Sequence, residues 1–138
     1  MSLEWREQLS VGNDVIDADH KYLIEIINQA ERGFVTHDRE KLRDALDRLA
    51  QYSKTHFDAE EKIAGAAGFT DVDRLHESHV ALLADLNRLK QEFAGDWTPE
   101  LTGHFTALLR AWLIDHVIKE DLRARPFLTK RSPKFDPR

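Results

Sequence analysis

The sequence predicts an all-α protein, an antiparallel up-down-up-down four-helix bundle with an irregular N-terminal arm. Helix breakers are scarce, with 6 glycines and 4 prolines among 138 residues. Four stretches carry apolar residues at spacings of three and four, the period of a helix that buries one face. Short turn-forming segments separate these stretches, which favours antiparallel neighbours. We therefore expect a single domain over residues 1–138, with an arm at 1–16, a bundle at 17–123 and a tail at 124–138.

Each helix has recognisable boundaries. The first is predicted over 17–34 and the second over 38–66, and each ends near glycine. The third opens at Thr70 with a sequence that resembles a capping box. The fourth has Thr98 as its N-cap and Pro99 at its first helical position, where both residue types are favoured.

The composition excludes several classes of function. A formal net charge of −5 and the lack of a basic face argue against nucleic-acid binding. The chain contains no cysteine, so any metal must be bound by nitrogen and oxygen ligands. No apolar run approaches the length of a membrane span and no secretory signal is visible, so we expect no membrane association and a cytoplasmic location. The sequence does not indicate a protein partner.

All four predicted helices place a metal-binding side chain on a face that should be apolar. His56 and Glu60 stack at i and i+4 on the second helix, where an unpaired buried carboxylate would be costly. His20, His79 and His116 occupy comparable positions on the first, third and fourth helices. Because His20 and His79 come early in their helices and the others come late, an antiparallel bundle brings all five to one end. A shared metal would satisfy them, and iron, manganese and zinc suit such ligands.

The sequence resembles the hemerythrin family in its bacterial single-domain form. The most specific matches are His-Phe-x-x-Glu-Glu at 56–61 and Trp-Leu-x-x-His-x-x-x-x-Asp at 112–121. Further matches are Ile-Asp-Ala-Asp-His at 16–20, Gly-Phe at 68–69 and His79 on the third helix. The resemblance covers nearly the whole chain.

The resemblance implies a bundle that holds two irons, an oxo or hydroxo bridge between them, and dioxygen as a ligand of one iron. His20 and His56 would bind the oxygen-binding iron, and His79 and His116 would bind the second. Glu60 and Asp121 would bridge the two. Trp112 and Leu113 match positions that line the oxygen pocket in the family. Leu23 and Ile24 lie on the apolar seam around the expected site, which would exclude water from the dioxygen.

Two positions raise alternatives. The family's third helix carries His-x-x-x-His, and ungapped counting from the second helix puts Leu75 where the first of these histidines belongs. His76 could swing in as a substitute, because an i, i+3 pair can share a metal. Otherwise the second iron lacks a ligand, which leaves one iron, a mixed-metal pair or a position filled by water. His116 and Asp121 are about 140° apart on an ideal helix, so spacing alone favours Glu120 and only the family pattern favours Asp121.

These features predict a non-haem di-iron protein that binds dioxygen for storage, delivery or sensing rather than an enzyme. A redox enzyme acting on peroxide or nitric oxide is the main alternative, because a missing ligand leaves more open coordination. A bundle with one metal, or with none and serving as an interaction module, is the third.

Overall fold

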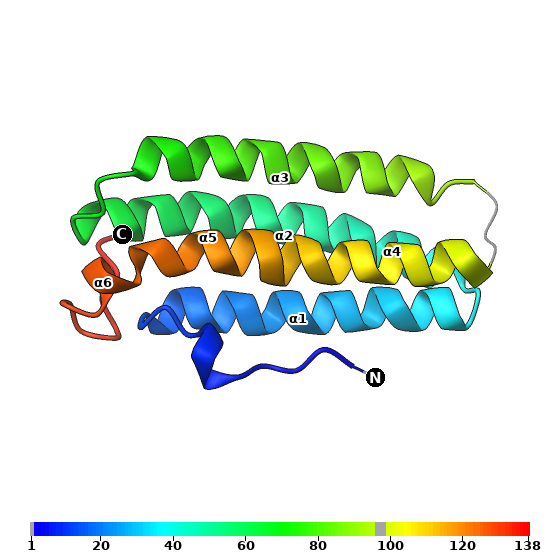
Figure 1. The fold of residues 1–138 in the computed structure, drawn as a ribbon, viewed down its shortest axis with the longest axis horizontal. Helices are drawn as coiled ribbons and strands as arrows, with labels where there is room; N and C mark the ends of the chain where they lie inside the picture. The colour runs from blue at the N-terminus through cyan, green and yellow to red at the C-terminus, as the bar shows by residue number, and fades with distance from the viewer. Residues whose placement is uncertain (1, 96–98) are drawn as a thin grey trace.

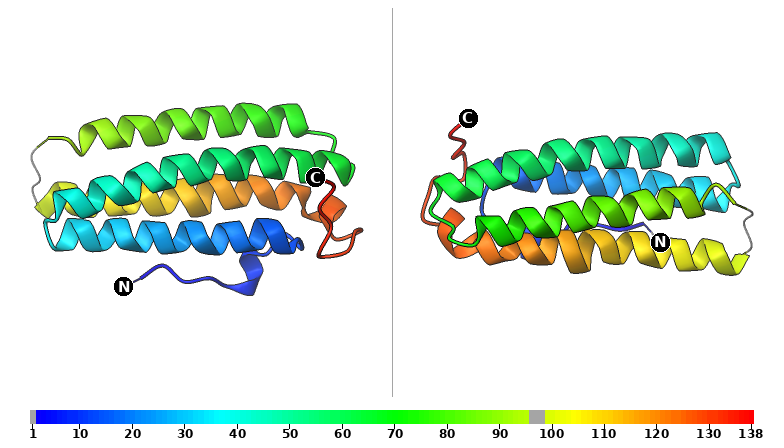
Figure 2. Two further views of the ribbon diagram at one scale, coloured as in Figure 1. Left: turned by 180° about the vertical axis from the view of Figure 1, so that it is seen from behind. Right: turned by 90° about the horizontal axis from the view of Figure 1, so that it is seen from above.

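The computed structural model describes residues 2–95 and 99–138, and the side chains at 99, 101, 102 and 116 lie outside that description. Four long helical runs lie side by side, with neighbours antiparallel (Figure 1), and the views from behind and above agree (Figure 2). No strand occurs among the described residues. The elements are η1 (Glu7–Leu9), α1 (Asp14–Val35), α2 (Arg39–Ala66), α3 (Val72–Glu92), α4 (Pro99–Ala111), the π-helical η2 (Trp112–Ile118), α5 (Lys119–Asp121), η3 (Leu122–Ala124) and α6 (Arg125–Leu128).

The start of α1 is a junction between the arm, the helix and the tail. α1 begins at Asp14, three residues before the predicted start, because the side chain of Asn13 caps it by accepting from two backbone N–H groups. The same Asn13 donates from Nδ2 to the carbonyl oxygen of Phe135 at 2.8 Å, and the Asp14 N–H donates to the carbonyl oxygen of Pro133 at 2.8 Å. The tail is therefore held against the first turn of the bundle.

The turn between α2 and α3 and the start of α4 differ in how well the sequence predicted them. Gly68 ends α2 with a positive φ of 100°, a conformation that glycine adopts without steric cost. The N-cap of α3 is Asp71, and it makes no side-chain capping bond, so the predicted capping box at Thr70 was wrong. α4 begins at Pro99 as predicted, while Thr98 lies outside the described residues.

Two apolar clusters fill the bundle, and a layer of buried polar groups lies between them. On α1, Ile16 belongs to the smaller cluster and Leu23 to the larger, and His20 falls between the two. On α3, His79 falls in the same way between Leu75 and Leu82. The polar layer therefore crosses the bundle near the end where α1 begins. Among the described residues, none of the helices has the length and apolar character needed to cross a membrane.

Candidate metal centre

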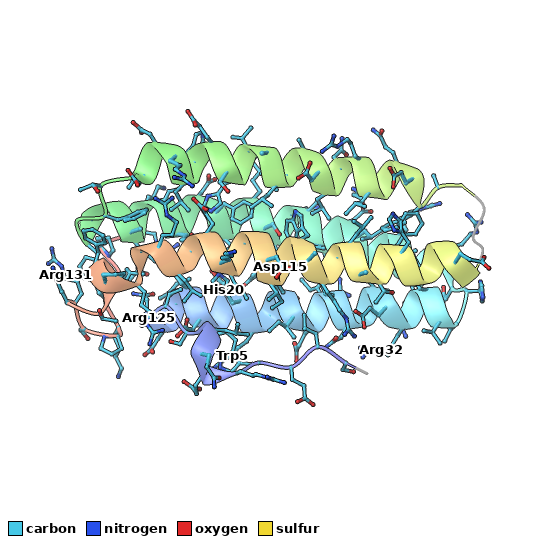
Figure 3. The ribbon with its side chains drawn as sticks, in the orientation of Figure 1. Trp5, His20, Arg32, Asp115, Arg125 and Arg131 are labelled. Atoms are coloured by element: carbon cyan, nitrogen blue, oxygen red, sulfur yellow. The ribbon has the colours of Figure 1, made fainter. Side chains whose placement is uncertain are left out.

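Four polar side chains from three helical elements converge in the polar layer. His20 comes from α1, His56 and Glu60 from α2, and Asp121 from α5, and each is at most 1% exposed. One ligand atom from each of the four lies within 4.8 Å of all the others. Figure 3 places His20 toward the end of the bundle that also carries α6 and Arg125. The predicted convergence at one end is thus present for His20, His56 and Glu60, and Asp121 joins them.

Glu60 and Asp121 each present their two oxygens to opposite sides of the cluster. Oε2 of Glu60 lies 3.0 Å from Nε2 of His56, and Oδ2 of Asp121 lies 2.7 Å from Nε2 of His20. The other oxygens face His79, whose Nε2 lies 3.5 Å from Oε1 of Glu60 and 3.7 Å from Oδ1 of Asp121. Such a division between two groups of histidines is the arrangement that two bridging carboxylates adopt.

Several polar atoms of the cluster are buried without a hydrogen-bond partner among the described residues. They include Nε2 of His56, Nε2 of His79, both oxygens of Glu60 and Oδ1 of Asp121. Unpaired buried groups of this kind are costly, and a cation among them would satisfy the imidazole nitrogens and the carboxylate oxygens together. The donor set of nitrogen and oxygen, with no thiolate, fits a non-haem iron.

The outward-facing nitrogens of two histidines are held by acids that the sequence analysis did not single out. Oδ2 of Asp19 lies 2.9 Å from Nδ1 of His56, and Oε2 of Glu61 lies 2.9 Å from Nδ1 of His79. The ring of Phe57 also stacks on His79, with centroids 4.0 Å apart. Carboxylates in this position fix the tautomer and direction of a metal-binding imidazole. Their sequence signal is weak, because both acids stand beside an already assigned ligand and resemble a solvated helix face.

In the absence of metal, the histidines and carboxylates of the cluster stabilise each other's charges. Burial alone would lower the pKa of His79, but Asp121 and Glu60 outweigh it and raise that pKa from 6.5 to about 10. Burial also opposes charge on His20 and His56, yet the same carboxylates raise both pKa values. Burial would raise the pKa of Asp121, but its contacts with Glu60 and the three histidines hold it well below 3.8. Protons on the histidines thus balance the carboxylate charges, as a metal cation would.

The π-helical segment explains why Asp121, rather than its neighbour, enters the cluster. Asp121 is 1% exposed, whereas the side chain of Glu120 is 19% exposed and accepts from Arg123 at 2.9 Å. A π-helix pairs each residue with the fifth one along, so the residues that follow η2 are rotated relative to a continuous α-helix. The preference for Glu120 from ideal spacing was therefore wrong.

The structure does not bring every predicted ligand to the cluster. Leu75 is 1% exposed and packs in the smaller apolar cluster, next to the polar layer. His76 has a side chain that is 60% exposed, and its Nδ1 lies 2.7 Å from Oε1 of Glu61, on the outside of the bundle. Of the two alternatives at this corner, the geometry favours a missing ligand over a substitute from His76. The side chain of His116 lies outside the described residues, so its role as a ligand stays a prediction.

The residues expected to line a dioxygen pocket are all buried in the larger apolar cluster. Trp112 also donates from Nε1 to the carbonyl oxygen of Leu82 at 2.9 Å, which satisfies its one polar group. The burial of all four expected pocket residues is compatible with water exclusion beside the cluster, and their contact with dioxygen stays a prediction. They are Leu23, Ile24, Trp112 and Leu113.

Comparison with known proteins points to one family. A family model described as the hemerythrin HHE cation binding domain matches residues 11–128. The bacteriohemerythrin of Stenotrophomonas maltophilia (strain R551-3) is 29% identical over 122 residues, which cover 86% of this chain and 76% of that protein. The bacteriohemerythrin of Methylococcus capsulatus (strain Bath) is 29% identical over 116 residues, covering 82% of this chain and 86% of that protein.

Solved structures show the same fold. A crystal structure of a leucine-to-tyrosine mutant of hemerythrin has a TM-score of 0.79 with this chain, at 22% identity, and covers 94% of this chain and 99% of that one. This likeness confirms the predicted four-helix bundle. The family model, which spans most of the chain, confirms the resemblance drawn from the sequence motifs. The chain belongs to the hemerythrin family.

Proposed function

We propose that this protein binds a pair of irons in the polar layer and binds dioxygen at one of them. The observation that carries the proposal is the division of carboxylate oxygens, with one oxygen each of Glu60 and Asp121 toward His20 and His56 and the other toward His79. A site for a single ion would need no such division. The unpaired buried atoms of the cluster support the same proposal.

The residues would hold the pair asymmetrically. His20 and His56 would bind one iron, His79 with the predicted ligand His116 would bind the other, and Glu60 and Asp121 would bridge. Bound iron supplies the electrons that dioxygen needs in order to bind. The surrounding apolar cluster contributes by keeping water and proton donors away from the site, which favours reversible binding over release of reduced oxygen.

A second function is favoured by Leu75. Because its side chain packs in the smaller apolar cluster, the His79 side of the site has one protein ligand fewer than the family pattern provides. An open coordination position on that side would admit peroxide or nitric oxide, so turnover of these molecules is the alternative to reversible dioxygen binding.

The test is anaerobic loading with ferrous iron, followed by metal analysis and by optical spectra before air, after air and after renewed deoxygenation. Reversible dioxygen binding predicts about two irons per chain and a visible band that appears with air and disappears without it. The variant Glu60→Ala should lose iron, whereas His104→Ala, which removes an exposed histidine of α4, should keep it. A wild-type protein that retains no iron would contradict the proposal.

A further inference from the structure

The chain has only two tyrosines, and they lie against each other beside the metal centre. Tyr22 on α1 and Tyr52 on α2 have ring centroids 4.5 Å apart with an interplanar angle of 41°. The ring of Tyr22 is at the surface, with the residue 38% exposed, and Tyr52 is partly buried behind it. Neither residue has a role in the metal site as described so far.

Tyr52 is connected to a metal-binding histidine through one carboxylate. Its hydroxyl donates to Oδ1 of Asp19 at 2.5 Å, and Oδ2 of the same Asp19 lies 2.9 Å from Nδ1 of His56. On the other side of that imidazole, Nε2 lies 3.0 Å from Oε2 of Glu60. Two hydrogen bonds and one ring contact thus lead from His56 in the polar layer, through Asp19 and Tyr52, to the exposed ring of Tyr22.

On the opposite side of the cluster, a carboxylate again joins a buried histidine to an exposed side chain, but that side chain is an imidazole instead of a phenol. There Glu61 joins Nδ1 of His79 to the exposed imidazole of His76. Both arms fix a histidine through a carboxylate, so orientation alone requires neither tyrosine. A phenol differs from an imidazole in that it gives up one electron and one proton to form a stable radical. Of these two arms, the one through Tyr52 therefore connects the metal centre to the surface with groups that can carry an electron.

We propose that Tyr52 and Tyr22 form a relay that delivers electrons one at a time from small reductants at the surface to the metal centre when it meets hydrogen peroxide. The proposal rests on the proposed iron binding. The reductants are molecules that give up a hydrogen atom readily, such as ascorbate or small phenols. Dioxygen is too weak a one-electron oxidant to draw an electron from a phenol, so the relay is silent during reversible dioxygen binding.

The electrons and protons balance. Reduction of hydrogen peroxide breaks the O–O bond and consumes two electrons and two protons to give two waters. For each electron, Tyr52 is oxidised and its phenolic proton moves along the existing hydrogen bond to Asp19. Tyr22 then reduces Tyr52, which recovers its proton from Asp19, while Tyr22 loses its own proton to solvent. The reductant returns one electron and one proton to Tyr22. Two such cycles reduce one peroxide to two waters, and the two protons that Tyr22 releases to solvent balance the two that the peroxide takes up.

The protonation of Tyr52 and the position of Asp19 suit this proton transfer. Burial and the neighbouring Asp19 raise the pKa of Tyr52 well above its ordinary value, which keeps the phenol protonated at neutral pH. Oδ1 of Asp19 already accepts the phenolic hydrogen bond at 2.5 Å, so this oxygen is in position to receive the proton.

The test uses the full chain loaded with ferrous iron and then oxidised in air, so that the iron itself no longer supplies the two electrons that peroxide takes up, and iron per chain is measured first. Peroxide is then added, and the frozen sample is examined by electron paramagnetic resonance. The wild type should show a tyrosyl radical, Tyr52→Phe should show none, and Tyr22→Phe should show a longer-lived radical at Tyr52. Peroxide-driven ascorbate oxidation should be lost in Tyr52→Phe and retained in Trp5→Phe, a control that removes an oxidisable ring of the N-terminal arm.

A second readout needs no metal. In the metal-free protein, photochemical oxidation by tris(bipyridine)ruthenium(III) should produce a hydrogen-bonded phenoxyl signal that is lost in Tyr52→Phe. An iron-loaded wild type that consumes peroxide without a tyrosyl radical, or a Tyr52→Phe variant that oxidises ascorbate at the wild-type rate, overturns the relay and leaves the iron site intact. Absence of bound iron before peroxide is added overturns the proposed function itself, and with it the relay.

Discussion

His79 is held between two adjacent glutamates, and Glu61 takes the nitrogen that faces away from the site. Oε2 of Glu61 lies 2.9 Å from Nδ1 of His79, while Nε2 of the same ring lies 3.5 Å from Oε1 of Glu60. With a metal bound, the proton stays on Nδ1 and Nε2 is free to coordinate. The other oxygen of Glu61 contacts His76, so His76 supports the carboxylate that orients His79.

The first prediction concerns this orientation. Glu61→Ala should weaken iron binding on the His79 side by roughly 10- to 100-fold, because the imidazole loses the acceptor that fixes its tautomer. Glu61→Gln keeps an acceptor oxygen and should lose less iron affinity. His76→Ala leaves Glu61 in contact with His79 and should lose the least iron affinity of the three variants. Competition with a chelator under anaerobic conditions gives the affinities. Equal affinity in the wild type and Glu61→Ala would contradict the assigned role.

The second prediction concerns the missing histidine. Leu75→His should raise the affinity for the second iron, so that at limiting iron the variant holds more metal per chain than the wild type. Leu75 lies one turn before His79 on α3, so a histidine side chain at this position would extend from the edge of the polar layer. In the metal-free protein the substitution should cost about 2 kcal/mol, because a polar ring replaces a buried alkyl group. A wild type that already binds two irons with equal affinity would remove the basis for this expectation.

The third prediction separates two neighbouring acids. Asp121→Asn should lower iron affinity by at least roughly tenfold, because the amide leaves the bridging position without its charge. Glu120→Gln should leave iron affinity unchanged and weaken its surface pairs with Arg123 and Arg74, which contribute little to stability. Metal analysis of the two purified variants after the same loading decides the matter. The reverse result would mean that the π-helical segment does not set the register of this end of the helix.

The bundle and most of the cluster could be predicted from spacing, and the exceptions have physical causes. His20, His56, Glu60 and His79 occupy positions that the helical period assigns to the buried face, so regular helices were sufficient to find them. Asp121 could not be placed in this way, because its register depends on a change from α to π hydrogen bonding that the period of apolar residues does not record. The family motif identified Asp121, whereas the geometry of an ideal helix favoured Glu120.

Asp19, Glu61 and Tyr52 show a second limit. Each lies at the margin of a helix face, where an acid or a tyrosine is equally compatible with solvent. Their roles arise from contacts between helices, since Tyr52 on α2 bonds to Asp19 on α1, and Glu61 on α2 bonds to His79 on α3. Pairing across helices depends on how the helices are rotated against each other, and one sequence does not fix that rotation closely enough.

The fourth prediction follows from the charges of the metal-free cluster. His79 has a folded pKa of about 10 against an ordinary value of 6.5, so the stability from its charged form is fully present below pH 6.5 and is lost as pH rises toward 10. His20 and His56, whose pKa values are also raised, act in the same direction. Asp121, whose pKa is depressed, contributes above pH 3.8 and loses its contribution as pH falls below that value.

The metal-free protein should therefore be most stable between about pH 4 and 6.5 and should lose stability on the alkaline side. Iron displaces the protons that the histidines hold, so iron affinity should rise over the same alkaline range. The difference in melting temperature between loaded and metal-free protein should thus widen from pH 6.5 upward, as thermal unfolding followed by circular dichroism would show. His104→Gln, which removes an exposed histidine far from the cluster, should give the same curves as the wild type. A metal-free protein that becomes more stable between pH 6.5 and 10 would mean that the imidazoles are neutral before metal arrives, and that protons do not compete for the site.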